Sequence, residues 1–268
     1  MDELSEASPR RLPAGRRADL AAYVAEAGQV TVGMLAERFD VSIDTVRRDL
    51  DELDRIGLII RTHGGAVSVQ DQPRNDRDLD VRLRMQTAEK ETIAALAAKL
   101  VPDGSVIMIN AGTTALALAR ALGDHRDLTI ATNNLRIPAV ISPKSFRDLY
   151  VFGGPVRTIT QATTGPVSLR MANGGDEVDV RCDLALIAVG AVSESAYSTS
   201  NLGDASMMND MMQRATRTAI LADSSKLGRR LFAQVSPLAA ADYLVTDAPP
   251  PDDIAEALAA AGVQVVTP

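Results

Sequence analysis

The sequence predicts an α/β protein that begins with a small helical unit and continues into a larger domain built on a mostly parallel sheet. Two observations carry this prediction. Between residues 16 and 67, three short helical patterns are followed by a β-hairpin pattern. After residue 88, short β-branched runs alternate with helical stretches, and several of these runs are apolar nearly throughout. Strands that are buried on both faces of a parallel sheet have this composition.

The composition is that of a protein with a sizeable core. The 268 residues are 46% hydrophobic and 24% charged, and a chain of this length suits one or two domains. Aromatic residues make up 3% and Trp is absent, so the core must consist mainly of Ala, Val, Leu and Ile. The single cysteine, Cys182, excludes an internal disulfide and a cysteine-based metal cluster.

The distribution of apolar residues argues against a membrane protein. No run approaches the roughly 18 apolar residues of a membrane span, and the opening segment lacks the apolar core of a secretory signal. We therefore expect a cytoplasmic protein without a membrane partner. The net charge of −7 argues against a non-specific coat on nucleic acid, although a total does not decide where local charges lie.

The N-terminal part is predicted to hold two short helices after a flexible segment. Residues 1–15 are polar and contain two prolines, which predicts the flexible segment. A first helix is predicted from Arg16 to Gly28, with Leu20, Val24 and Ala27 along it. Thr31 can cap a second helix, whose inner side is predicted to hold Met34, Leu35 and Phe39.

A third helix and a hairpin follow. Ser42 is predicted to cap the helix and Gly57 to end it. Its apolar residues recur at steps of three and four, the spacing of one helix face, at Ile43, Val46, Leu50 and Leu53. The segments LIIRTH and AVSV are separated by Gly64-Gly65, and adjacent glycines permit the positive φ angles of a tight hairpin turn. This order predicts a winged helix-turn-helix over residues 16–69, with the hairpin as its wing.

Two adjacent arginines on the third helix are the first candidate binding residues. At about 100° per residue, Arg48 points away from the apolar face and Arg47 lies at its edge. Ser42 and Thr45 stand at the helix N-terminus, where a helix-turn-helix protein contacts base edges and phosphates. The alternative is a solvated face on which Arg48 pairs with acids one turn away. The preceding helices and a hairpin that carries Arg61 and His63 favour DNA binding.

The charge balance of this part sets a condition on DNA binding. From residue 10 to residue 67 there are nine arginines and nine acids, so the domain is neutral rather than basic. DNA binding therefore requires segregation, with arginines at the helix start and on the wing and acids towards the far end of the third helix.

The remaining chain is predicted to form a linker over residues 70–87 and a second domain over residues 88–268. The linker is polar and contains Pro73. An alanine-rich helix is predicted from Ala88 to Leu100. The expected strands are VIMIN (106–110), LTIATN (128–133), LYVFGG (149–154), DLALIAVG (183–190), TAILAD (218–223), YLVTD (243–247) and VQVVT (263–267).

Polar turns follow several of these strands, at the sheet edge where such folds bind ligands. After the strand 106–110, Gly112, Thr113 and Thr114 lead into a helix, and free amides with two hydroxyls at a helix N-terminus suit a phosphate. A helix cap without a ligand is the alternative. Thr132-Asn133 and Gly153-Gly154 close the next two strands, and Lys226 follows the strand 218–223. Lys226 is placed to reach either a phosphate or a neighbouring carboxylate.

Residues 41–67, VSIDTVRRDLDELDRIGLIIRTHGGAV, resemble the winged helix-turn-helix signature of the DeoR family of bacterial transcriptional regulators. The resemblance extends from about residue 16 to residue 247, with Arg82 and Lys90 matching the opening of the second domain. It implies a repressor of carbohydrate-metabolism genes that binds double-stranded operator DNA as a homodimer or homotetramer. The residues predicted to contact DNA are Thr31, Ser42, Thr45, Arg47, Arg48, Arg61 and His63.

By the same resemblance, the second domain is a Rossmann-like effector domain related to ribose-5-phosphate isomerase. It implies a phosphorylated sugar or similar metabolite as the effector that releases the operator. The phosphate side is predicted at Gly112, Thr113, Thr114 and Lys226, and the sugar side at Thr132, Asn133, Gly153 and Gly154. Asn110 stands where the family often has Asp, and we include it in the predicted site because its amide can both donate and accept.

Met residues gather in one helical segment, where Met208 stands in place of a lysine that is common in the family. The segment carries Met207, Met208, Met211 and Met212. Adaptable core packing and a subunit interface are both consistent with such a stretch, and the sequence leaves the choice open.

We predict binding without catalysis. An isomerase needs a general base, and the candidates are Asp183, Asp204 and Asp223, of which Asp183 opens a strand at the wrong end and Asp223 belongs with Lys226. No metal-ligand spacing or nucleophile motif appears, so we expect no catalytic residue, metal or cofactor. A third possibility, an accessory protein that has lost DNA binding, is disfavoured by the intact RRDL and HGGA segments.

Overall fold

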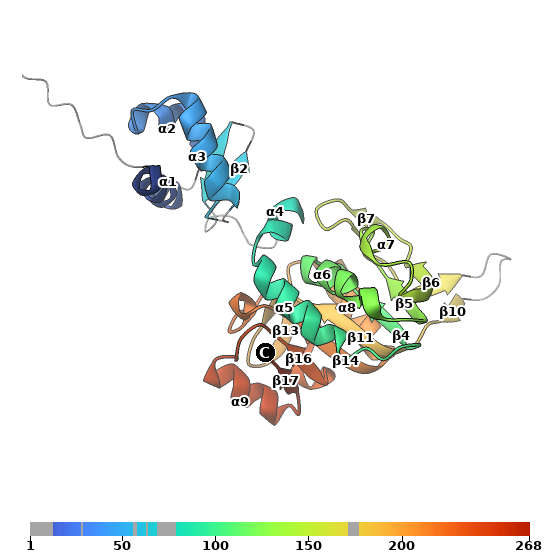
Figure 1. The fold of residues 1–268 in the computed structure, drawn as a ribbon. Helices are drawn as coiled ribbons and strands as arrows, with labels where there is room; N and C mark the ends of the chain where they lie inside the picture. Colours follow the sequence, from blue (N-terminus) through green and yellow to red (C-terminus); the bar gives the residue numbers. More distant parts are fainter. Residues whose placement is uncertain (1–12, 28, 56–57, 63, 69–78, 171–176) are drawn as a thin grey trace, which may run out of the picture. The chain divides into compact units, whose positions relative to one another are not determined.

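The computed structural model of the protein describes residues 13–27, 29–55, 58–62, 64–68, 79–170 and 177–268. The chain divides into two compact units, residues 1–77 and residues 78–268, which we describe separately. Figure 1 shows their elements along the sequence. Within the described ranges, no helix combines the length and the apolar character that crossing a bilayer requires.

The first unit is a three-helix head with a small antiparallel sheet. Its helices are α1 (Pro13–Ala27), α2 (Val32–Arg38) and α3 (Ile43–Arg55). Its strands are β1 (Gln29–Thr31), β2 (Ile59–Thr62) and β3 (Gly65–Ser68), in the order β1-β3-β2. The three helices and the hairpin are as predicted, except that Gly65 belongs to β3 and not to the turn, and β1 is an additional strand. Helix α1 begins at Pro13, so residues 13–15 belong to it and not to the predicted N-terminal segment. Gly57, the predicted end of α3, lies outside the described residues.

Gly65 is required by a close approach of two strands. It begins β3 opposite Thr31 of β1, and a Cβ atom at this position would lie 1.9 Å from the carbonyl oxygen of Val30. At Gly64 a Cβ atom would meet nothing within 4 Å. The pairing of the wing with β1, which the sequence did not predict, is therefore the reason that this position is glycine.

The core of the first unit is smaller than the helical spacing predicts. Ile43 is 48% exposed and Met34 is 50% exposed, so the prediction that both face inward is wrong. Ile43 is the first residue of α3, and Met34 lies on a helix of only seven residues. The buried residues are Leu20, Val24, Val30, Val32, Leu35, Val46, Leu50, Leu53, Ile59 and Ala66.

The second unit is built on a seven-stranded sheet in the order β17-β16-β14-β11-β4-β5-β6, and every neighbouring pair in it is parallel. All seven strands fall within or overlap the predicted runs. They are β4 (Val106–Ile109), β5 (Leu128–Thr132), β6 (Phe146–Val151), β11 (Cys182–Ala188), β14 (Ala215–Leu221), β16 (Tyr243–Val245) and β17 (Gln264–Val266).

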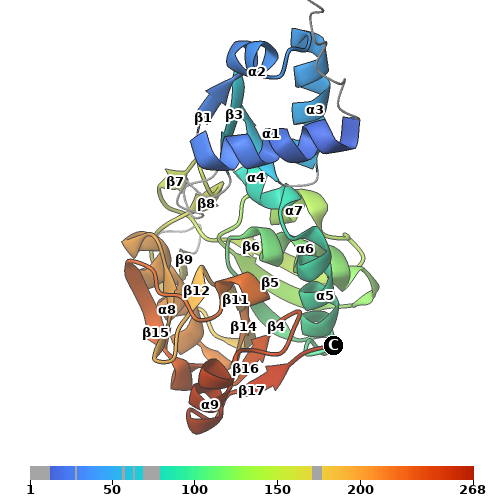
Figure 2. The ribbon, with the colours of Figure 1, turned by 90° about the vertical axis from the view of Figure 1, so that its left-hand side faces the viewer.

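Helices cover both faces of this sheet (Figure 2). One core contains residues of α5 (Thr87–Ala98), α6 (Thr113–Ala121) and α7 (Ile137–Val140). The other contains residues of α8 (Leu202–Gln213) and α9 (Asp252–Ala260). Strand β11 contributes alternate residues to the two cores, as expected of a strand buried on both faces. All four methionines of α8 are buried in the second core, so this stretch packs within the protomer.

Several short elements depart from the predictions. Helix α4 (Leu79–Arg84) lies within the predicted linker 70–87, and α5 begins inside it at Thr87. Three small antiparallel groups were not predicted. They are the hairpin of β7 (Val156–Arg157) and β8 (Ala162–Thr163), the pair of β9 (Ser168–Arg170) and β10 (Glu177–Asp179), and the sheet of β12 (Ala191–Val192), β13 (Ala196–Thr199) and β15 (Ala233–Pro237).

Candidate functional site

The N-terminus of α3 is capped as the sequence predicts. The backbone N–H of Thr45 donates to Ser42 Oγ at 3.2 Å, and the two hydroxyl oxygens lie 2.9 Å apart. Thr31 caps α2 in the same way, accepting from the backbone N–H of Met34 at 3.3 Å. Ser42 and Thr31 are exposed and Thr45 is half-buried, so the caps stand at or near the surface.

The two arginines of α3 point to solvent. Arg48 is exposed and makes no hydrogen bond or ion pair with any described residue. Arg47 is also exposed, with Nη1 3.4 Å from Asp44 Oδ1. An ion pair between two exposed side chains contributes little stability. Arg48 therefore does not form the intrahelical pairs that the alternative interpretation offers it.

The acids in the middle of α3 are engaged by α1. Asp49 is buried and accepts from Arg16 Nε at 2.6 Å. Arg17 Nε lies 3.6 Å from the other oxygen of Asp49, and Arg17 Nη1 lies 3.9 Å from Glu52. Asp49 and Glu52 thus lie beside α1, whereas Arg48 is exposed to solvent. Asp44 stays exposed at the helix start beside Arg47, so the predicted separation of arginines from acids is incomplete.

Arg61 joins the wing to α3. Its Nε donates to Asp51 Oδ1 at 3.0 Å and its Nη1 donates to the carbonyl oxygen of Gly65 at 3.1 Å. Its backbone N–H donates to Asp54 Oδ1 at 3.0 Å. The side chain is therefore tied within the unit and not extended into solvent as its place in the predicted DNA-binding set suggests. His63, in the same set, lies outside the described residues.

In the second unit, a glycine turn leads directly into α6. Gly112 precedes the helix with φ 151°, and a Cβ atom there would lie 3.2 Å from the Ala188 Cβ. Thr113 and Thr114 are buried in the first turn of α6. The Thr114 hydroxyl is buried and has no hydrogen-bond partner among the described residues.

Asn110 and Thr132 use their side chains to join strands. Asn110 Nδ2 donates to the carbonyl oxygen of Ala188 at 2.9 Å, and Asn110 Oδ1 accepts from the Ala188 N–H at 2.7 Å. The Thr132 hydroxyl donates to the carbonyl oxygen of Ile109 at 2.6 Å and accepts from the N–H of Asn134 at 3.0 Å. These bonds occupy groups that the sequence assigned to the effector.

The next two turns are held together by a close crossing of the chain. Asn133 Nδ2 donates to the carbonyl oxygen of Thr163 at 2.8 Å, and Asn133 Oδ1 is buried without a partner among the described residues. Gly154 has φ 131°, and a Cβ atom there would lie 2.4 Å from the carbonyl oxygen of Thr164. A glycine is thus required where this turn meets the strand β8.

A buried cluster of charges surrounds Asp223. Asp223 is buried, and Lys226 Nζ lies 3.5 Å from its Oδ2. Burial raises the pKa of Asp223, but Lys226, the Ser225 hydroxyl and Lys90 together bring that pKa below its ordinary value. Burial, and then the charge of Lys226, lowers the pKa of Lys90 to about 8. Three ionisable side chains therefore sit close together at the end of β14.

The turn that carries Lys226 is fixed by a residue of the next strand end. The N–H of Ser224 donates to Asp247 Oδ1 at 2.7 Å, and the Ser224 hydroxyl donates to Asp247 Oδ2 at 3.0 Å. Asp247 closes the predicted strand 243–247 and so joins the ends of β14 and β16. The position of Lys226 is thereby set by two neighbouring strands.

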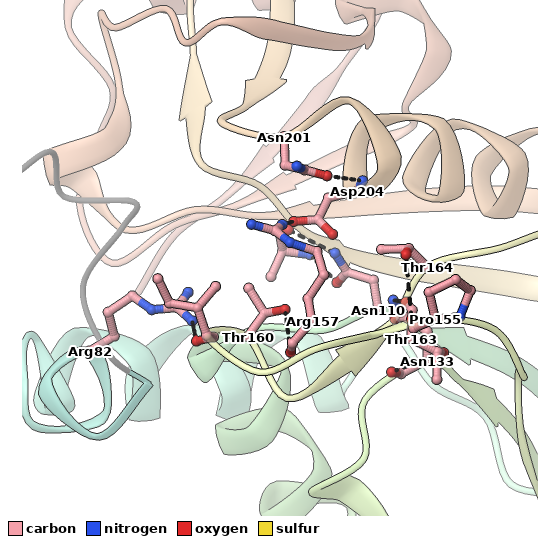
Figure 3. A network of polar contacts seen from close by, with 12 residues as sticks. Arg82, Asn110, Asn133, Pro155, Arg157, Thr160, Thr163, Thr164, Asn201 and Asp204 are labelled. Atoms are coloured by element: carbon pink, nitrogen blue, oxygen red, sulfur yellow. Dashed lines mark hydrogen bonds and ion pairs between the residues drawn. The ribbon is translucent and has the colours of Figure 1, made fainter.

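A second charged pair lies between the β7–β8 hairpin and α8 (Figure 3). Arg157 Nη1 donates to Asp204 Oδ2, and both side chains are largely buried. The N–H of Asp204 donates to Asn201 Oδ1 at 3.1 Å, which caps α8. Burial raises the pKa of the Asp204 carboxyl above its ordinary value, although Arg157 and Arg82 act in the opposite direction.

Comparisons with known proteins decide the family. A family model of the DeoR-like helix-turn-helix domain matches residues 16–72, and a model of the DeoR C-terminal sensor domain matches residues 85–248. The chain belongs to the DeoR family. These two matches account for both units of this DeoR family protein, in the order in which they occur.

Relatives of this DeoR family protein are transcriptional repressors. The HTH-type transcriptional repressor CsqR of Escherichia coli (strain K12) is 32% identical over 94% of this chain and 95% of its own length. The glycerol-3-phosphate regulon repressor of the same organism is 31% identical over 88% of this chain and 91% of its own length. A ribose 5-phosphate isomerase A from Methanocaldococcus jannaschii is 19% identical, covering 52% of this chain and 53% of that chain with a TM-score of 0.35.

In the second unit of this DeoR family protein, several residues that surround the predicted effector site could not be recognised from the sequence. The sequence indicates Lys90 only as a family match and Asp204 only as a candidate base, whereas the predicted pairing of Asp223 with Lys226 is confirmed. Arg157 was not singled out, because a lone arginine in a loop carries no signal of its own. The sequence does place Arg157 three residues after Gly154. It therefore lies on β7, which begins just after this glycine turn and pairs with β8.

Proposed function

We propose that the chain is a DNA-binding repressor of carbohydrate-metabolism genes that leaves its operator when a phosphorylated sugar binds to its second unit. Family membership and the similarity to two relatives, a transcriptional repressor and a glycerol-3-phosphate regulon repressor, support the general role. The effector and the release of DNA are our inference for this chain.

In this proposal the N-terminus of α3 enters the major groove. Ser42 and Thr45 present hydroxyls and Arg47 and Arg48 present guanidinium groups, and residues in this position contact base edges and phosphates. The observation that carries the proposal is Arg48, which is exposed and bonds to no residue that the structure describes, whereas its neighbour Asp49 is buried against Arg16. Binding should weaken as salt rises, because phosphate contacts release counterions.

The remaining members of the predicted DNA-binding set take supporting roles. Arg61 holds the wing against α3 through Asp51, so we propose that it orients the wing on the DNA and does not reach far from the protein. Thr31, exposed at the start of α2, is placed to meet the phosphate backbone. His63 stays a prediction for the wing tip.

The effector is proposed to bind between the turn before α6 and the Asp223 cluster. Amides of Gly112, Thr113 and Thr114 at a helix N-terminus suit a phosphate, and Lys226 supplies positive charge. The Thr114 hydroxyl and Asn133 Oδ1 are buried and have no hydrogen-bond partner in the part of the chain that the structure describes, which supports a polar ligand here. Asn133, Gly153 and Gly154 line the sugar side in this proposal, with Asp204 beyond them, whereas Asn110 and Thr132 support the turns from behind.

Binding without turnover fits the engagement of the candidate bases. Asp204 is held by Arg157, Asp223 lies beside Lys226, and Asp183 accepts the N–H of Val106 at 2.8 Å. We also propose a homodimer or homotetramer, because helix-turn-helix proteins bind two half-sites about one DNA turn apart. Light scattering of the purified protein would measure the oligomeric state.

One experiment tests the proposed function as a whole. Genomic fragments that the purified protein retains would be selected, and one of them would be titrated by fluorescence anisotropy. Glycerol 3-phosphate and a panel of pentose and hexose phosphates would then be added. We expect at least one phosphorylated compound to release the fragment, while its unphosphorylated counterpart does not. Selective retention of no fragment, or release by none of the phosphates, would overturn the proposal.

A further inference from the structure

Helix α4 is the first described element of the second unit, and the described element before it in the chain is β3 of the first unit. Helix α4 has six residues, which is too short to be stable as an isolated helix. Leu79 is buried, Leu83 packs against the core formed by α5 and α6, and α4 contacts α6. The position of α4 therefore depends on its contacts with the rest of the second unit.

One polar contact ties α4 to the phosphate side of the proposed effector site. Lys90, buried on α5, donates through Nζ to the carbonyl oxygen of Arg82 at 2.6 Å and to that of Met85. These carbonyls belong to the C-terminal end of α4 and the turn that follows it. Lys90 is also within electrostatic range of Lys226 and Asp223. An anion bound at Lys226 would change the field at the group that holds the end of α4.

A second polar contact ties α4 to the sugar side. Arg82 Nη2 donates to the carbonyl oxygen of Ile159, in the loop between β7 and β8, at 3.2 Å. Arg157, which pairs with Asp204, is the last residue of β7 before this loop, and the hydroxyl of Thr160 in the loop donates to the Arg157 carbonyl oxygen at 3.4 Å. Figure 3 shows Arg82 beside this loop and Arg157 near its start, with Asp204 on α8 next to Arg157. A ligand that displaces Arg157 or Asp204 would move the carbonyl group that Arg82 binds.

We propose that α4 is the element that reports occupancy of the effector site to the DNA-binding unit. Both sides of the site reach the same helix through separate contacts, Lys90 on one side and Ile159 on the other. Along the chain, α4 is the first described element of the second unit and therefore the one nearest to the first unit in sequence. This inference rests on the proposed function and specifies how that site is coupled to DNA. Arg82 acts here as a positioning residue and touches no effector atom.

The test compares Arg82→Met with the wild-type protein and with Arg120→Met, which alters an exposed arginine on α6. Operator affinity is measured by anisotropy with and without a saturating phosphorylated compound that releases the wild type, taken from a panel that includes glycerol 3-phosphate. Affinity for that compound is measured separately by calorimetry. For Arg82→Met we expect the affinity for the operator without the compound, and the affinity for the compound, to stay within about threefold of wild type. The ratio of operator affinities should fall to within about threefold of unity, from the roughly 5–150-fold usual for coupled sites.

A second measurement does not depend on a variant. Hydrogen exchange of the peptide covering residues 79–85 is followed in the wild type with and without the same compound. The inference expects the exchange rate of this peptide to change on binding. If wild-type protein is released but Arg82→Met is released equally well and exchange in 79–85 does not change, the relay is refuted while the proposed function stands. If no compound releases the wild type, the proposed function fails and the relay fails with it.

Discussion

Arg16 Nε lies 2.6 Å from Asp49 Oδ2, and this buried pair joins α1 to the helix that carries Arg48. Asp49 follows Arg48 directly in the RRDL segment. The acid of this segment therefore has a structural role, and the arginine before it is left on the outer face. Of these two neighbours in the sequence, Asp49 stabilises the fold and Arg48 is exposed at the surface.

The first prediction concerns the stability of the head. Asp49→Ala leaves Arg16 largely buried without its partner, and loss of one member of a buried pair typically costs about 3 kcal/mol or more. Asp44→Ala, the matched control, removes the exposed partner of Arg47, and such a pair is worth at most about 1 kcal/mol. Urea unfolding followed by circular dichroism would measure both. Equal losses in the two variants would refute the role assigned to Asp49.

The second prediction concerns the glycine pair of the wing. Gly65→Ala places a Cβ atom 1.9 Å from the Val30 carbonyl oxygen, so β1 and β3 must separate. Forcing an extra atom into a packed position costs about 1–3 kcal/mol. Gly64→Ala meets nothing within 4 Å and should change the free energy of unfolding by less than about 0.5 kcal/mol. Thermal melts of the two single variants test this. A lower melting temperature for Gly64→Ala than for Gly65→Ala would contradict the role assigned to Gly65.

The third prediction concerns Lys226. Lys226→Ala should leave operator affinity unchanged and blunt release by a phosphorylated compound, because it removes positive charge from the proposed phosphate site. Lys144→Ala, which alters an exposed lysine outside the proposed site, should be released normally. Anisotropy titrations with and without the compound supply both values. Normal release of Lys226→Ala would remove this residue from the site.

The fourth prediction concerns pH. The pKa of Lys90 is lowered to about 8 in the folded protein from 10.5. Between these values the unfolded chain binds more protons at this residue than the folded one. The contribution of Lys90 to stability should therefore rise with pH from about 8 to 10.5, by a total on the order of 3 kcal/mol. Below pH 8 both states are protonated and the contribution is constant.

The measurement for this prediction is the free energy of unfolding in urea across pH 7 to 10.5 for wild type and Lys90→Met. Cys182 and Tyr197, whose pKa values are raised by burial, titrate in both proteins and cancel in the difference. Wild type minus variant should increase with pH. A difference that stays flat or decreases would show that Lys90 is not held as described.

The parallel sheet could be predicted because its signal is strong and local. Strand β11 reads CDLALIA, and successive residues of such a strand must be apolar because alternate ones enter opposite cores. Helix α4 could not be predicted, because six residues with three charges are too few to show an apolar period and are helical only through the contacts of Leu79, Leu83 and Lys90. Strand β1 depends likewise on pairing with β3, far along the chain.

The turns of the candidate site could be predicted from the sequence, but the hydrogen-bond partners of its side chains could not. Gly112, Thr113 and Thr114 follow a strand directly, so their place at the sheet edge could be predicted. The bonds of Asn110 to Ala188, and of Arg61 to Asp51, depend on which residues the fold brings opposite them. Composition and spacing give the residue type, whereas three-dimensional contacts decide whether that side chain faces a ligand or the protein.

The last prediction concerns the surface of α3. Because Arg48 makes no bond within the described protein, Arg48→Ala should leave the melting temperature unchanged. If Arg48 contacts operator DNA, its loss should cost about 1–3 kcal/mol of binding, and loss of a phosphate contact should also reduce the salt slope by about one.

The most direct measurement is therefore an anisotropy titration of a selected operator fragment with wild type, Arg48→Ala and Arg120→Ala at several salt concentrations. The account predicts that Arg48→Ala binds about tenfold or more weakly, while Arg120→Ala binds as the wild type does. Wild-type affinity in Arg48→Ala would contradict the claim that this face of α3 binds DNA.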